Sequence, residues 1–188
     1  MKIKPQTELF EAQTTWFHIF KNMIDSGDVA KMGPHACTVY LVIKAHTNYS
    51  TGLSFPAIET ISEKSGISVA QVKRELVKLE ALGYITKEKL GRKNSYTLRE
   101  KIEIKDEQGR PSAVATWDYL PSSVAAAVAD LKNVLVTGDA AQIVHIERLT
   151  VNVANAGGIV LNMGNNNNIP EHVREQIQAI LRTAGRKL

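Results

Sequence analysis

The sequence predicts an α+β protein in which a mainly helical N-terminal half is followed by strands and helices. Before residue 83, apolar residues recur every three or four positions in several segments, which is typical of helices that pack on one face. After residue 83, apolar and polar residues alternate in short runs, as in half-buried strands. The chain has 188 residues, 44% apolar and 22% charged, which suits one domain with an extension or two small domains.

The N-terminal segment from Thr7 to Ile24 is expected to form a helix, because its large apolar residues have helical spacing. Such an aromatic stripe either packs on its own domain or contacts a second copy, and the sequence leaves both alternatives open. We interpret His18 beside it as structural rather than as a metal ligand. Residues 26–35 contain two glycines and a proline and are expected to form a loop.

The next segment, residues 35–46, is predicted to be a helix. It contains Cys37, which is the single cysteine of the chain and therefore excludes an internal disulfide. Within a predicted helix, we interpret this cysteine as a small buried apolar residue rather than as a nucleophile.

The stretch from Ser54 to Leu98 is the one around which the rest of the chain is organised. A short helix is predicted over Pro56–Ser65, and Gly66 ends it where a tight turn is needed. Ser68 then begins a second helix as its N-cap, and Gln71 can reach back to the Ser68 backbone N–H, so SVAQ indicates a capping box. The apolar stripe of this helix consists of Val69, Val72, Leu76 and Leu79.

Gly83 is expected to end the second helix as its C′ residue. Residues 84–90 and 95–98 are predicted to be two strands around the polar turn Gly91–Asn94. Helix, glycine turn, capped helix and hairpin follow one another in the order of a winged helix-turn-helix. We therefore divide the chain into an N-terminal helical extension (1–33), a winged helix-turn-helix domain (34–101) and a second region (102–188).

Positive charge is concentrated on residues 64–101 of the predicted winged helix-turn-helix. Residues 64–101 contain ten Lys or Arg and four Glu, a net charge of +6, whereas the whole chain carries +4. A helix fits the major groove of DNA, where Gln pairs with adenine and Arg or Lys with guanine, so double-stranded DNA is the predicted partner. Gln71 and Arg74 are the best candidates for reading bases, and Arg92 and Lys93 would lie on phosphate or in the minor groove. The predicted DNA contacts are Ser68, Ala70, Gln71, Lys73, Arg74, Lys78, Arg92, Lys93, Asn94 and Ser95.

The run from Thr38 to Ile85, with its Phe55-Pro56 pair, resembles the winged helix-turn-helix proteins of bacterial plasmids, phages and other mobile elements. These include regulatory and replication-initiator-like members. In that family a helix such as Thr38–His46 precedes a loop that ends in a Phe-Pro pair. The resemblance covers about Pro34 to Leu98 and implies double-stranded DNA as the partner.

The region 102–188 is predicted to be a small α+β unit of β-β-α-β-β-α order. We expect it to oligomerise or to dock another protein, because a two-fold dimer would double the DNA interface and match a palindromic site. The Asn165–Asn168 tract is expected to be a linker or loop. The predicted strands are 102–105, 112–120, 142–154 and 159–163, and the predicted helices are 122–136 and 169–188.

Catalysis is not expected. His145 and Glu147 share one predicted strand face, but the sequence has no glycine-rich phosphate loop, nucleophile elbow or metal-ligand spacing, so no cofactor or metal is predicted. No apolar run is long enough for a membrane span and no signal peptide is recognisable, so we expect a cytoplasmic protein.

These observations predict a transcriptional regulator of a plasmid, phage or other mobile element that acts as a homodimer or higher homo-oligomer. A replication initiator or partition adaptor protein is the alternative within the same class. Winged helices also serve as plain docking modules, and a charged helix face is often only solvated, so an interaction module without DNA binding is the alternative of another class.

Overall fold

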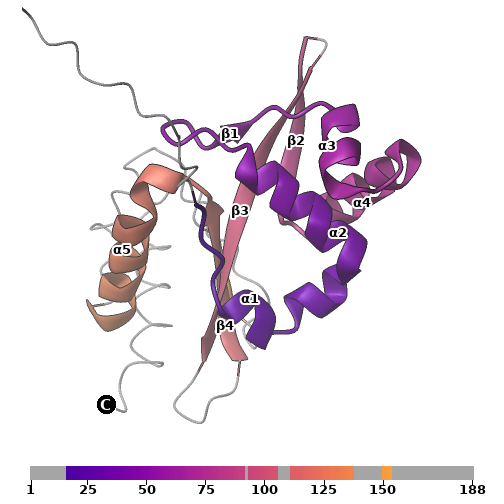
Figure 1. Cartoon of the computed structure of the whole chain (residues 1–188). Helices are drawn as coiled ribbons and strands as arrows, with labels where there is room; N and C mark the ends of the chain where they lie inside the picture. Colours follow the sequence, from indigo (N-terminus) through magenta and orange to yellow (C-terminus); the bar gives the residue numbers. More distant parts are fainter. Residues whose placement is uncertain (1–15, 92, 106–110, 138–149, 154–188) are drawn as a thin grey trace, which may run out of the picture.

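The long strand β3 runs through the middle of the protein, with α2, α3 and α4 on one side and α5 on the other (Figure 1). The computed structural model describes residues 16–91, 93–105, 111–137 and 150–153. The helices are α1 (Asn22–Asp25), α2 (Asp28–Ala45), α3 (Ile58–Ser65), α4 (Val69–Ala81) and α5 (Val124–Thr137), with a 3₁₀ turn at Pro121–Ser123. The strands are β1 (Leu53–Ser54), β2 (Ile85–Leu90), β3 (Lys93–Lys105), β4 (Pro111–Asp118) and β5 (Thr150–Val153).

Helix α2 begins earlier than the sequence predicts and is kinked. Gly33 has non-helical backbone angles (φ 73°, ψ 169°), and Pro34 starts the straight second part, a position where its missing N–H leaves no helical bond unmade. The helix predicted at residues 35–46 is therefore confirmed. The loop predicted over 26–35 is wrong for residues 28–32, 34 and 35, which are helical.

Of the helix predicted over Thr7–Ile24, the structure describes residues 16–24; the prediction is wrong for residues 16–21 and confirmed for residues 22–24, which belong to α1. Residues 16–20 have no regular secondary structure, and only the single turn α1 follows them. Phe20 of this segment contacts the sheet: the ring centroids of Phe20 and Trp117 are 6.2 Å apart, whereas Trp16 is 84% exposed. Tertiary contacts therefore replace the regular helix that the spacing predicts.

Helices α3 and α4 lie where the sequence predicts them. Gly66 follows α3 in the left-handed conformation (φ 70°), and Gly83 has the same conformation just after α4. Both helices bury their apolar stripes in one core with α2 and the adjoining strands. The largest fully buried side chains of this core are Tyr40, Tyr96, Met32, Ile43, Ile61, Leu79, Ile85, Leu98, Val39 and Val72.

Strand β3 belongs to both halves of the molecule. It pairs antiparallel with β2 over residues 93–98 and with β4 over residues 99–105, and β1 also pairs with it. The sequence predicts two separate strands here, at 95–98 and 102–105, and this is wrong. Leu98, Glu100 and Ile102 alternate on one face, and the charged residue among them is buried, so the strand continues.

A second, smaller core lies between the β3–β4 sheet and α5. Ala115 and Trp117 of β4 and Ala127 and Leu131 of α5 are buried together. Phe20, Ile102 and Ile104 pack against them. The strand and helix predicted at 112–120 and 122–136 are therefore confirmed.

Strand β5 pairs with β4 and lies inside the strand predicted at 142–154. The rest of that prediction lies outside the described residues, as do the strand at 159–163, the Asn165–Asn168 tract and the helix at 169–188.

A buried ion pair joins the helical half to the long strand. Lys44 Nζ of α2 lies 2.5 Å from Glu100 Oε1 of β3, and the two side chains are only 1% and 6% exposed. His18 Nε2 lies 3.2 Å from the same carboxylate oxygen. The Lys44 ammonium also lies 4.2 Å from the Tyr119 ring centroid. The N-terminal segment, α2, β3 and the residue after β4 thus meet at one buried charge cluster.

Burial acts against both charges of this pair. It lowers the pKa of Lys44 below the ordinary 10.5, and the charge of Glu100 offsets only part of this effect. Burial by itself would raise the pKa of Glu100, but His18 and Lys44 outweigh it and lower that pKa below 4.5. Glu100 is therefore ionised at neutral pH.

The loop before β1 meets the backbone after β4 at Gly52. This glycine has φ 68°, and a Cβ atom placed on it would lie 2.6 Å from the Tyr119 carbonyl oxygen. Close by, the Ser122 N–H donates a hydrogen bond to the Tyr49 carbonyl oxygen at 3.2 Å. Only a residue without a side chain allows the two backbones to approach this closely.

We predict that Gly52→Ala destabilises the protein more than Gly66→Ala does. Both positions have φ near +70°, but nothing lies within 4 Å of a Cβ at Gly66. Gly66→Ala should cost about 1 kcal/mol of unfolding free energy through backbone strain alone. Gly52→Ala should cost about 1 to 3 kcal/mol more because of the steric clash with Tyr119. Urea unfolding of both variants measures this difference, and equal costs would contradict the close approach.

We also predict that Lys44→Met costs about 3 kcal/mol of unfolding free energy, because it leaves Glu100 buried without its ammonium partner. The double variant Lys44→Met/Glu100→Leu should be clearly more stable than this single variant. As a control, Lys31→Met removes an exposed ion pair to Asp28 and should cost less than about 1 kcal/mol. If the double variant lost as much stability as Lys44→Met, an unpaired Glu100 could not be the cause.

Candidate nucleic-acid interface

The N-terminus of α4 is capped as predicted, but only on one side. Ser68 Oγ accepts a hydrogen bond from the Gln71 backbone N–H at 3.3 Å, which confirms the N-cap. The reciprocal half of the predicted capping box is wrong, because the Gln71 side chain turns away from Ser68 toward Glu75 and Arg74. Two charged residues one turn further along α4, Arg74 and Glu75, hold the Gln71 amide in place of the Ser68 backbone.

The first two turns of α4 present an outer face to solvent. Ala70, Lys73 and Arg74 are exposed and Gln71 is half-buried, while Val72 and Leu76 are buried on the opposite face. Of the predicted contacts in α4, these four residues therefore lie together on one accessible surface, which we call the α4 outer face.

Hydrogen bonds connect three polar residues of α4 along the helix. Arg74 donates to Gln71 Oε1 through Nε, at 3.1 Å, and also through Nη2. Gln71 Nε2 donates in turn to Glu75 Oε1, and Glu75 is only 7% exposed. We call Glu75, Gln71 and Arg74 the α4 polar relay. It links a buried carboxylate to an exposed guanidinium.

Lys78, the last predicted contact in α4, makes an internal bond. Its Nζ donates to the Met32 carbonyl oxygen at 2.7 Å, directly before the kink in α2. Lys101 is bonded similarly: its Nζ donates to the Leu82 carbonyl oxygen and lies 4.1 Å from the Tyr84 ring centroid. These two cations therefore connect α4 to its neighbours within the fold.

The β2–β3 hairpin is tighter than the sequence predicts. Leu90 pairs with Lys93, so two residues connect the strands, and Gly91 has φ 61° as such short turns require. The predicted four-residue turn over Gly91–Asn94 is wrong, because Lys93 and Asn94 already belong to β3.

The predicted hairpin contacts have different exposures. Lys93 is exposed. Asn94 is half-buried and donates a hydrogen bond through Nδ2 to the Tyr96 hydroxyl at 3.2 Å, while Ser95 is buried. Arg92 lies outside the described residues.

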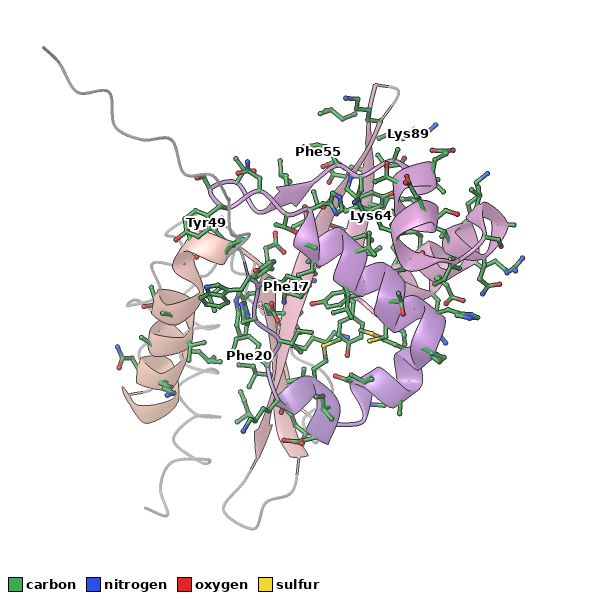
Figure 2. The ribbon with its side chains drawn as sticks, viewed as in Figure 1. Phe17, Phe20, Tyr49, Phe55, Lys64 and Lys89 are labelled. Carbon is green, nitrogen blue, oxygen red and sulfur yellow. The ribbon has the colours of Figure 1, made fainter. Side chains whose placement is uncertain are left out.

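A hollow of about 1190 Å³ lies beside the hairpin, and sequence reasoning did not anticipate it. Lys89 and Lys93 of the hairpin and Phe55 from the chain before α3 are among its lining residues. Lys89 is exposed and Phe55 is 43% exposed, and Figure 2 shows both at the hairpin end of the molecule. The sequence did contain a sign that Lys89 could be functional. Lys87 and Lys89 alternate along β2, and alternate residues of a strand lie on the same face.

Charge is distributed unevenly among these elements. Helix α3 exposes Glu59 and Glu63 as well as Lys64, whereas the α4 outer face carries Lys73 and Arg74. In β2, Lys87 Nζ lies 3.4 Å from Glu80 Oε2, which partly offsets its charge. The accessible positive charge therefore lies mainly on the α4 outer face and at the hairpin.

We also inspected the described residues for metal ligands, membrane-spanning helices and reactive side chains. Among the residues that the structure describes, no three His, Cys, Asp or Glu side chains gather as metal ligands would, and no helix is long and apolar enough to cross a membrane. Cys37 is half-buried against the core, and this burial raises the pKa of its thiol. His145 and Glu147 lie outside the described residues.

Comparison with protein families gives one match, which falls on the helical half of the chain. Residues 30–85 match the model of a family described as a helix-turn-helix domain, and this segment contains α3, α4 and most of α2. Searches of curated proteins and of solved structures gave no match. In DNA-binding helix-turn-helix proteins the second helix of the motif lies in the major groove, and α4 is the second of the two helices that flank the Gly66 turn in the matched segment. The matched domain thus supports DNA as a partner.

Proposed function

We propose that this protein is a sequence-specific double-stranded DNA-binding protein with a winged helix-turn-helix, in which α4 enters the major groove. The observation that carries the proposal is the α4 outer face, where Lys73 and Arg74 are exposed beside Gln71 at the start of the second helix of the matched domain. Residues near the N-terminus of this helix are the ones that reach base edges in such complexes.

The β2–β3 hairpin would be the wing and would contact the DNA backbone or the minor groove. The exposed Lys89 and Lys93, together with Arg92, which precedes Lys93 in the sequence, would provide cations for phosphate contacts. Such contacts add affinity that is nearly independent of sequence. Specificity would then come from α4 and affinity in large part from the hairpin.

In biological terms we propose a transcriptional regulator of a plasmid, phage or other mobile element, which acts by occupying its site without chemistry of its own. One recognition helix covers few base pairs, so two copies on a palindromic site would bind more tightly and more selectively. Residues 102–188 would hold the copies together.

We predict that the protein binds duplex DNA with an affinity that falls steeply as salt rises, because each phosphate contact releases counterions. Replacing Arg92 and Lys93 with Ala should weaken binding to all duplexes alike and lower the slope of log K against log salt by about 1 per lost contact. Fluorescence anisotropy over a range of salt concentrations measures both quantities.

Exposed lysines elsewhere provide the matched control for this measurement. Lys21 and Lys132 are exposed but lie away from α4 and the hairpin, so the double change Lys21→Ala/Lys132→Ala removes the same charge. It should leave the salt slope nearly unchanged. If both double variants behaved alike, or if the wild-type protein showed no salt-dependent binding, a docking module without DNA binding would be the better account.

A further inference from the structure

We infer that Arg74 reads a guanine and that Gln71 positions Arg74 rather than reading a base itself. This inference rests on the proposed function, since it assigns roles within the α4 outer face. It separates two residues that the sequence alone presents as equivalent base readers.

The α4 polar relay fixes one edge of the Arg74 guanidinium. The edge formed by Nε and Nη2 points at Gln71 Oε1, with the Nε contact at 3.1 Å. A guanidinium has five N–H donors, so three remain for another acceptor, one on Nη2 and two on Nη1. These donors form the end-on fork of the side chain, and two parallel N–H groups match the O6 and N7 acceptors of guanine in the major groove.

Gln71 already uses both ends of its amide. To read adenine, a glutamine needs its oxygen for the N6 amino group and its own amino group for N7. In this structure the Gln71 oxygen accepts from Arg74 and its amino group donates to Glu75. Both lone pairs of the Gln71 oxygen accept from Arg74, so reading adenine would displace the Arg74 guanidinium and break the relay at that bond.

The relay also reduces the cost of ordering Arg74 on DNA. An exposed arginine ordinarily loses rotamer freedom when it binds, and this loss weakens the complex. Because Gln71 is itself held by Glu75, Arg74 is ordered before DNA arrives. The buried member of the relay thus contributes to recognition without touching the DNA.

The test begins with a duplex selected from a random pool by the wild-type full-length chain. Each guanine in the selected site is replaced in turn by 7-deazaguanine, which lacks the N7 acceptor. One such replacement should weaken wild-type binding about tenfold and should have no further effect on Arg74→Ala, because the contact is already lost.

The positioning role is tested by Gln71→Ala and by two changes at Glu75. Gln71→Ala should keep salt-dependent binding to unrelated duplexes but should bind the selected duplex about threefold more weakly, because Arg74 is no longer held. Glu75→Gln keeps an acceptor for Gln71 and should retain the preference for that guanine, whereas Glu75→Leu should reduce it. Lys73→Ala is the control, since it removes a neighbouring exposed cation outside the relay and should leave the guanine preference intact.

Several results would overturn this inference. If 7-deazaadenine at one position weakened the wild-type protein but not Gln71→Ala, Gln71 would be a base reader. A selected site in which no guanine replacement mattered would also contradict it. In both cases DNA binding itself would stand, whereas the absence of salt-dependent binding to any duplex would overturn the proposed function together with this inference.

Discussion

The buried ion pair between Lys44 and Glu100 is the interaction on which the arrangement of this protein depends. It joins α2 of the helical unit to the middle of β3, where the partner of that strand changes from β2 to β4. Because both charges are desolvated, separating them would leave an unpaired charge in the interior. The lowered pKa of Glu100 means that its stabilising contribution is present above about pH 4.5 and is lost as the pH falls through its lower folded-state pKa.

Strand β3 extends from this ion pair into both halves of the molecule. One end forms the hairpin beside the helix-turn-helix, and the other end forms the sheet that packs on α5. Gly52 strengthens the same junction, since it lets the backbone before β1 touch the backbone after β4. One continuous strand therefore connects the second region to the proposed DNA-binding surface.

Local signals in the sequence were sufficient for the central helices. The Ser68 N-cap, the left-handed Gly66 and Gly83 and the apolar spacing of α4 depend only on nearby residues, and the structure bears them out. Predictions that depended on distant partners were less successful. Residues 16–20 form no helix, and Phe20 among them packs against Trp117 of the sheet. Strand β3 continues through Glu100 because Lys44 neutralises it.

In the candidate site too, the sequence predicted which side chains lie on the polar face of α4 but not which groups they bind. Spacing placed Lys78 on the polar side of α4, but only the fold brings the Met32 carbonyl within its reach. Spacing likewise presented Gln71 and Arg74 as equivalent, whereas their bonds to each other and to Glu75 distinguish them. A sequence can show which residues share a face, but the hydrogen-bond partners that decide their roles come from packing.

The most direct measurement of the central claim, that α4 enters the major groove, is an NMR titration of the 188-residue chain with a selected duplex. Backbone amide shifts should concentrate at residues 68–74 of α4 and at residues 89–94 of the hairpin, and those at residues 114–118 of β4 should stay nearly unchanged. Shifts confined to β4 and α5, with the α4 amides unmoved, would contradict the account.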